Sequence, residues 1–280
     1  MQSIVSTEWL QQHLNDPDLI VLYVMGLKRK QQALQEQADA VQIPGSRFFD
    51  LKQDFQRPGS ELPNTIPTPA QFTAACQALG IRKDSKIVLY DSSGIYASPR
   101  AWYLFKVMGH AEVAVLNGGL PAWQAAKLPV ESFQKHLFTA GDFQANFQAD
   151  QFQDTAAIQT NIASQDRAVI DARSEGRFQG TAPEPRAGLS SGHIPGSYNI
   201  PFTEVLENGH YKSSEELSAI FNQLDLQQDK LTFSCGSGIT ACIVLLAAEQ
   251  VLGDLPKAIY DGSWTEWAST EGLPINKQDQ

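Results

Sequence analysis

The strongest candidate for chemistry is a cysteine that follows a short apolar run. Residues 231–234 (LTFS) read as a buried strand, Cys235 comes next, and Gly236, Ser237 and Gly238 lead into an apolar helical stretch. The thiolate is the nucleophilic form of cysteine, and a helix N-terminus favours it over the thiol. Because glycine permits unusual backbone angles, successive N–H groups can turn inward here. The corner therefore predicts a site that holds a sulfur anion.

The other two cysteines indicate no chemistry. Cys76 and Cys242 lie inside helical apolar patterns, where a small buried side chain is the usual role of cysteine. On the local pattern alone, the same role stays open for Cys235. The chain has three cysteines, with neither a CxxC pair nor zinc-finger spacing to histidines. These features argue against a disulfide framework and a structural metal, and no motif requires an organic cofactor.

An internal repeat sets the position of this corner. Residues 86–95 (KIVLYDSSGI) align without a gap with residues 230–239 (KLTFSCGSGI), and an Ile-Pro-Gly-Ser motif occurs once in each half. Self-similarity at this distance indicates duplicated domains. Asp91 stands in the first copy where Cys235 stands in the second, so only the second copy carries the thiol.

The elements around the repeat predict the fold class. Strand-like runs alternate with helical segments, a pattern typical of an open, mostly parallel α/β sheet. Thr68 and Ser213 each precede residues suited to the first turn of a helix. The stretch 131–160 lacks a long periodic pattern and is the natural joint. We expect two tandem α/β domains, each a mostly parallel sheet flanked by helices, over residues 1–145 and 146–280.

Composition and charge narrow the class of partner. The chain has 280 residues, of which 42% are hydrophobic and 19% charged, as in folded soluble proteins. Its net charge of -10, with one short basic run at residues 28–30, argues against nucleic acid or an acidic membrane surface as a partner. The sequence has neither an export signal nor an apolar run long enough to span a membrane, so we expect a cytoplasmic location.

Six short motifs give the chain a family resemblance. They are DAR (171–173), GRF (176–178), EPR (184–186), GHIPGS (192–197), NIPF (199–202) and CGSGIT (235–240). Their order resembles the two-domain rhodanese-like sulfurtransferases, and most of all the 3-mercaptopyruvate branch of that family. The resemblance spans essentially the whole chain. It implies two tandem rhodanese-like domains, of which the N-terminal copy is inactive.

The resemblance also implies the roles of individual residues. Cys235 and Ser237 would be catalytic, and Arg177 and Arg186 would hold the carboxylate and the keto oxygen of the substrate, because a guanidinium pairs well with a carboxylate. The other loop residues expected to line the substrate site are Gly236, Gly238, Ile239 and Thr240. Thiosulfate-specific members usually have basic side chains in this loop, so Gly-Ser-Gly favours mercaptopyruvate. His193 precedes Ile-Pro-Gly, and we expect it to stabilise a turn.

One part of the family pattern is missing. In the mercaptopyruvate branch, an aspartate and a histidine of the N-terminal domain form a relay with the loop serine. Here Lys52 stands at the aspartate position and Asn64 at the histidine position. Either the loop amides alone suffice to stabilise the thiolate, or the substrate differs from that of the branch.

Together these features predict an enzyme that moves sulfur from 3-mercaptopyruvate, through a Cys235 persulfide, to cyanide or to an acceptor thiol such as thioredoxin. Two alternatives stay open: thiosulfate is the donor, or the chain is a persulfide carrier with little turnover of its own. A phosphatase of related fold needs a longer loop that is closed by an arginine. Ala241 stands six positions after Cys235, so we set that reading aside.

Overall fold

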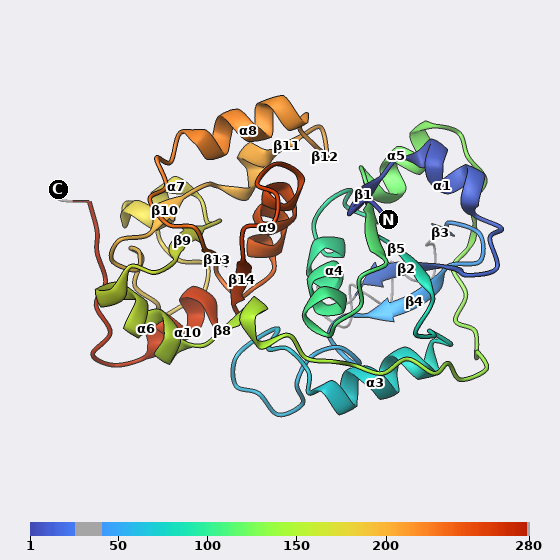
Figure 1. Cartoon of the computed structure of the whole chain (residues 1–280), viewed down its shortest axis with the longest axis horizontal. Helices are drawn as coiled ribbons and strands as arrows, with labels where there is room; N and C mark the ends of the chain where they lie inside the picture. Colours follow the sequence, from blue (N-terminus) through green and yellow to red (C-terminus); the bar gives the residue numbers. More distant parts are fainter. Residues whose placement is uncertain (26–40, 279–280) are drawn as a thin grey trace. The chain divides into compact units, whose positions relative to one another are not determined.

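The chain divides into two compact units. The computed structural model describes residues 1–25 and 41–278, so the basic run at 28–30 lies outside the described residues (Figure 1). The first unit comprises Met1–Pro58, Ile66–Gln148 and Asn208–Tyr211, and the second comprises Gly59–Thr65, Ala149–Glu207 and Lys212–Gln280. Each half of the sequence thus contributes one short segment to the compact unit built mainly from the other half, which the sequence did not indicate.

The first unit is built on a five-stranded sheet in the order β1-β6-β5-β2-β4, and all its strand pairs are parallel. Its strands are β1 (Ile4–Val5), β2 (Leu19–Met25), β4 (Arg47–Asp50), β5 (Lys86–Tyr90) and β6 (Val113–Leu116). Its helices are α1 (Thr7–His13), α3 (Pro69–Ala78), α4 (Ser98–Val107) and α5 (Gly119–Ala125). Two short strands, β3 (Val41–Gln42) and β7 (Glu131–Ser132), pair antiparallel beside it.

The second unit repeats this plan in the order β10-β9-β13-β14-β8, again with parallel pairs only. Its strands are β8 (Phe152–Gln153), β9 (Ala168–Asp171), β10 (Tyr198–Asn199), β13 (Leu231–Ser234) and β14 (Lys257–Tyr260). Its helices are α6 (Thr155–Ser164), α7 (Glu175–Gln179), α8 (Ser214–Asn222), α9 (Thr240–Val251) and α10 (Ser263–Ser269). The short strand β11 (Leu206–Glu207) and the 3-10 turns η1 (Ala149–Gln151) and η2 (Phe202–Val205) also belong to this unit, whereas the short strand β12 (His210–Tyr211) belongs to the first.

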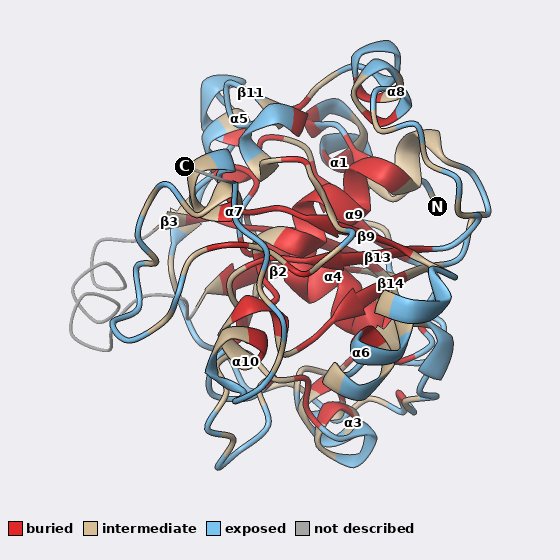
Figure 2. Cartoon of the chain, turned by 90° about the vertical axis from the view of Figure 1, so that its left-hand side faces the viewer, coloured by how far each residue is buried: buried red, intermediate tan, exposed pale blue. Residues whose placement is uncertain are grey.

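Burial explains the apolar runs of the central strands. A parallel sheet with helices on both faces has no face open to water, so its strands lack a polar alternation. All four residues of β9 and of β13 are buried, and so are eight residues of α9. The red ribbons of β9, β13 and α9 in Figure 2 mark this core. Helix α9 is apolar on nearly all sides because it lies inside its unit.

The duplication is visible in the sheet order. The repeat matches β5 with β13. With this match, the strand order β4-β2-β5-β6-β1 of the first sheet corresponds to the order β10-β9-β13-β14-β8 of the second. The predicted fold of two tandem α/β domains with mostly parallel sheets is confirmed. The predicted starts of α3 after Thr68 and of α8 after Ser213 are also confirmed, and both helices have a capping box.

Candidate active site

Cys235 lies directly after β13, at the carboxyl edge of the second sheet. Ser234 pairs in register with Asp171, so the residues after β13 and after β9 emerge at the same edge. This edge is where parallel α/β sheets gather ligands. Cys235 is 1% exposed. Its backbone N–H donates to the Ser263 hydroxyl at 3.3 Å, and its carbonyl accepts from the Trp264 N–H at 2.9 Å.

The loop after the thiol is fixed by the start of α10. The Gly236 carbonyl accepts from the Thr265 N–H at 3.1 Å and from the Thr265 hydroxyl at 2.6 Å. Gly238 has a φ of 78°, in the left-handed region that a residue with a side chain avoids. Two residues later, at Thr240, the chain enters α9. This sequence of turns holds the thiol beside the N-terminus of a twelve-residue helix.

Arg177, from α7, lies against this loop. A Cβ atom placed on Gly236 would be 3.1 Å from Arg177 Nη2, so the missing side chain gives the guanidinium room beside the thiol loop. Arg177 also pairs with Glu184: Nε is 3.1 Å from Oε1 and Nη2 is 2.6 Å from Oε2. The Arg177 side chain is 23% exposed and that of Glu184 only 3%. The buried Glu184 carboxylate therefore fixes one edge of the Arg177 guanidinium, while part of the Arg177 side chain stays exposed to solvent.

Glu184 is shared with a second, fully buried guanidinium. Arg173 Nη1 lies 2.8 Å from Glu184 Oε1, and Arg173 Nη2 lies 2.6 Å from Asp171 Oδ2. The Arg173 guanidinium also packs 4.1 Å from the centre of the Trp264 ring. Burial acts to lower the pKa of Arg173, but Asp171 and then Glu184 outweigh it, and the pKa lies above its usual value. Two guanidinium groups and two carboxylates thus alternate along one row.

Arg186 reaches the loop by a different route. Its Nη1 donates to the Thr265 hydroxyl, which in turn donates to the Gly236 carbonyl. Arg186 belongs to an exposed stretch. The two arginines that the sequence singled out therefore both lie next to Gly236, one directly and one through a threonine.

Asn64 contacts the loop serine. Its side-chain N–H group donates to the Ser237 hydroxyl at 3.1 Å and to the Ser237 carbonyl at 3.0 Å. Asn64 belongs to the Gly59–Thr65 segment, which is part of the second compact unit. Lys52, by contrast, is exposed and belongs to the first unit. Asn64, at the position of the relay histidine, therefore still contacts Ser237.

The first unit contains the same loop with a carboxylate in it. Asp91 Oδ2 accepts from three successive backbone N–H groups, those of Tyr96, Ala97 and Ser98, at 3.0, 2.8 and 2.9 Å. It also accepts from the Ser98 hydroxyl at 2.8 Å, and Oδ1 accepts from the Ser93 N–H at 2.9 Å. A side-chain anion at this strand end is thus surrounded by amide donors from the loop and the helix start.

Comparison with known proteins identifies the fold and the chemistry. The family model described as Rhodanese-like domain matches residues 6–126 and again residues 154–270. The chain belongs to the rhodanese family. It carries two rhodanese domains, and its relatives of established name are sulfurtransferases, so it is a sulfurtransferase.

Two relatives and one solved structure support this assignment across the whole length. The chain is 38% identical to thiosulfate/3-mercaptopyruvate sulfurtransferase 1, mitochondrial, of Arabidopsis thaliana, over 98% of this chain and 78% of the relative. It is 35% identical to the 3-mercaptopyruvate sulfurtransferase of Escherichia coli, over 97% and 96%. The crystal structure of SseA from Escherichia coli, a 3-mercaptopyruvate sulfotransferase with the rhodanese fold, matches with a TM-score of 0.82, 31% identity, and coverage of 94% and 99%.

The structure places the other residues that the sequence singled out in packing roles. His193 stacks on Phe178 with ring centroids 4.0 Å apart, and its Nδ1 lies 2.9 Å from the Phe178 carbonyl oxygen, so its side chain contacts α7. Burial raises the pKa of the Cys76 thiol well above its usual value. Cys242 is buried in α9, with Sγ 3.3 Å from the Gly238 carbonyl.

Two rhodanese-site residues were missed by the sequence reasoning. Glu184 lies in the irregular segment that follows α7, and Thr265 lies in α10. A glutamate two residues before a candidate substrate arginine was the available signal for Glu184. Thr265 carried no signal, because its role depends on α10 being packed against the loop.

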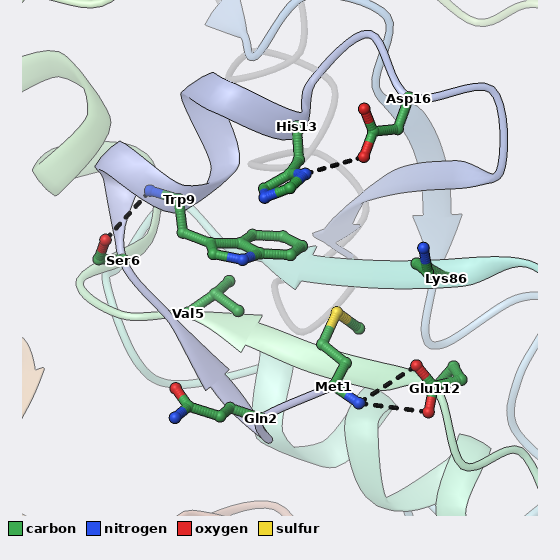
Figure 3. A pocket seen from close by; sticks show the side chains of 9 residues that line it. All are labelled: Met1, Gln2, Val5, Ser6, Trp9, His13, Asp16, Lys86 and Glu112. Atoms are coloured by element: carbon green, nitrogen blue, oxygen red, sulfur yellow. Dashed lines mark hydrogen bonds and ion pairs between the residues drawn. The ribbon is translucent and has the colours of Figure 1, made fainter.

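A separate hollow lies in the first unit. It has a volume of ≈ 610 Å³, and Trp9 of α1 lies across it, with Asp16, Lys86 and Glu112 at one side (Figure 3). None of the predicted site residues lines it.

Among residues 1–25 and 41–278, no three His, Cys, Asp or Glu side chains gather as metal ligands. In the same residues, no helix has the length and hydropathy needed to cross a bilayer.

Proposed function

We propose that this sulfurtransferase takes its sulfur from 3-mercaptopyruvate. The observation that supports this most is the meeting of Arg177 and Arg186 at Gly236, one residue from the thiol. A 2-oxo acid presents a carboxylate and an adjacent carbonyl, both of which guanidinium groups bind well. The uncharged Gly-Ser-Gly loop leaves this recognition to the two arginines.

The first half-reaction breaks the carbon–sulfur bond of the donor. The Cys235 thiolate attacks the donor sulfur and forms an S–S bond, and the C–S electron pair stays with carbon as the enolate of pyruvate. Arg177 and Arg186 stabilise the negative charge on the enolate oxygen, and its carbon takes up a proton to give pyruvate. The enzyme is left as a Cys235 persulfide. The amide donors that surround Asp91 in the first unit are a model of how this loop holds such an anion.

The second half-reaction returns the thiolate. A nucleophile such as cyanide or the thiolate of thioredoxin attacks the outer sulfur, and the S–S electron pair returns to Cys235. We place the reaction in the cytoplasm. The three cysteines are buried thiols and form no disulfide, as is usual in a reducing compartment. Cell fractionation with an antibody to the protein tests the location.

Sulfur transfer to cyanide, measured with 3-mercaptopyruvate and thiosulfate side by side, tests the donor. We expect a kcat/KM at least tenfold higher for 3-mercaptopyruvate and no turnover with Cys235→Ser, since a hydroxyl is far less acidic and nucleophilic than a thiol. Thiosulfate preference, or activity retained in Cys235→Ser, would contradict the proposal.

A persulfide carrier is the second candidate. In place of the relay histidine, Asn64 gives Ser237 an amide that cannot exchange a proton, and this favours slow turnover. A carrier would form one persulfide per chain with 3-mercaptopyruvate, which mass spectrometry would detect. Each addition of cyanide would then lead to the release of less than one molar equivalent of pyruvate per chain.

A further inference from the structure

The row of alternating charges behind Arg177 points to a residue that sets donor charge. Asp171, Arg173, Glu184 and Arg177 follow one another at ion-pair distances, and the formal charges of this row cancel. Arg177 is the end of the row that faces Gly236 and the only member with substantial exposure, at 23% against 3% or less. The positive charge of Arg177, which a sulfur donor would contact, is therefore already paired with the negative charge of Glu184.

We propose that Glu184 is a specificity-determining residue: by pairing with Arg177 it tunes the site to donors with a single negative charge and disfavours dianions. This inference rests on the proposed donor. A buried carboxylate is screened little by salt, so its repulsion of a second negative charge reaches the loop through a medium of low dielectric constant. A 2-oxo acid with a neutral thiol carries one negative charge, and thiosulfate carries two.

Glu184 acts on Arg177 through two hydrogen bonds as well as through charge. Both of its oxygens are used, at 3.1 Å to Nε and 2.6 Å to Nη2, so two donors of the Arg177 fork are committed before any substrate binds. A donor carboxylate must then use the remaining Arg177 donors and Arg186. Removal of the Glu184 charge weakens its hold on Nε and Nη2 of Arg177 and raises the net charge of the site by one unit.

The test is the ratio of kcat/KM for thiosulfate to that for 3-mercaptopyruvate in Glu184→Gln. The glutamine keeps the size of the side chain and removes the charge. We expect this ratio to rise on the order of tenfold, because one added positive charge favours the dianion more than the monoanion.

Asp171→Asn is the matched control. Asp171 also pairs with buried Arg173, so this variant removes a carboxylate from the same row and the same partner, but leaves the Arg177–Glu184 pair in place. Both variants are expected to unfold at lower temperature, because each leaves Arg173 with one carboxylate fewer. A donor ratio that changes equally in both variants, or in neither, would overturn the proposal.

A binding experiment separates this inference from the proposed reaction. In Cys235→Ser, which cannot form a persulfide, calorimetry gives the affinities for thiosulfate and for pyruvate with and without Glu184→Gln. The proposal requires thiosulfate affinity to gain about tenfold more than pyruvate affinity, and equal gains would refute it. Failure of the wild type to turn over 3-mercaptopyruvate would refute the proposed donor, while this binding difference would still report on Glu184.

Discussion

Asn64 holds the Ser237 side chain through an amide group, which does not change its protonation state with pH. An amide N–H donates to the Ser237 oxygens at every pH, so the hydroxyl keeps its own hydrogen for the sulfur or the donor. A histidine at this place would change its donor pattern near neutral pH. Asn64 has a φ of 60°, a conformation that asparagine tolerates better than most residues and that sets the angle of its side chain.

Replacement of Asn64 separates the hydrogen bond from the backbone turn. Asn64→Gly accepts the same φ and loses both side-chain hydrogen bonds to Ser237, so we expect kcat/KM to fall about tenfold. Asn64→Asp cannot donate and puts a carboxylate beside the loop, so its loss should be larger. Lys52→Ala, at an exposed position, is the control and should match the wild type. Equal activity in Asn64→Gly and Asn64→Asp would argue against the donor role.

The two loop glycines should respond differently to alanine. Gly238 needs its positive φ, so we expect Gly238→Ala to lower the free energy of unfolding by about 1–2 kcal/mol and to impair turnover. A methyl group on Gly236 would meet only the end of the Arg177 side chain, which can shift. Gly236→Ala should therefore stay folded and raise the donor KM more than it lowers kcat. Urea unfolding and steady-state kinetics check both; a Gly236→Ala enzyme with unchanged KM would contradict the proximity.

At the scale of elements, the apolar runs were the predictable part. The strand 231–234 and the helix that begins at Thr240 follow from sequence because β13 and α9 are buried almost throughout. The row that holds Arg177 could not be predicted in the same way. It joins side chains from the end of β9, from α7 and from the following turn, and such meetings depend on tertiary packing rather than on local pattern. The family motif located Arg177 and Arg186, but not what pairs with them.

Packing of α4 and β5 makes the first unit sensitive to acid. His110 follows α4, its Nε2 lies 2.8 Å from the Ser85 carbonyl, and burial lowers its pKa below its ordinary value. In the unfolded chain the imidazole takes up a proton near pH 6.5, but the folded chain resists protonation there, so stability falls as the pH drops below that value.

Urea unfolding at pH 7.5 and 5.5 measures this effect. We expect His110 to account for up to about 1 kcal/mol of the stability lost at the lower pH. His110→Gln should be less stable than the wild type at pH 7.5, where it lacks a matched partner for Ser85, but its stability should change less between the two pH values. A pH dependence as steep as that of the wild type would assign the effect to other groups.

At the scale of the whole molecule, the compact units do not coincide with the halves of the sequence. The second unit includes Gly59–Thr65, which carries Asn64, and the first includes Asn208–Tyr211, where the Tyr211 N–H donates to Asn117 at 2.9 Å. Asn64 and Asn208, one in each of these segments, both have a positive φ. Sequence patterns could not reveal this exchange, because short loops carry little hydrophobic signal.

Expression of the halves tests the exchange. A fragment of residues 146–280 keeps the thiol, both arginines and Glu184, but lacks Gly59–Thr65 and so one part of its compact unit. We expect it to unfold at a lower temperature than the full chain and to transfer sulfur at least tenfold more slowly, the loss of Asn64 and of loop order combined. Addition of the fragment 1–145 should recover part of the activity. A fragment 146–280 with full activity would show that the segment is dispensable.

The carboxylate in the first loop has a consequence for oxidative damage. Asp91 gives its loop a carboxyl group that peroxide does not oxidise, whereas a thiolate or persulfide at Cys235 can be oxidised to sulfenic and sulfinic acids. Of two loops with a common plan, the first therefore carries no sulfur for peroxide to oxidise. Exposure to peroxide should remove activity by modification of Cys235, while Asp91 in the corresponding loop stays unmodified.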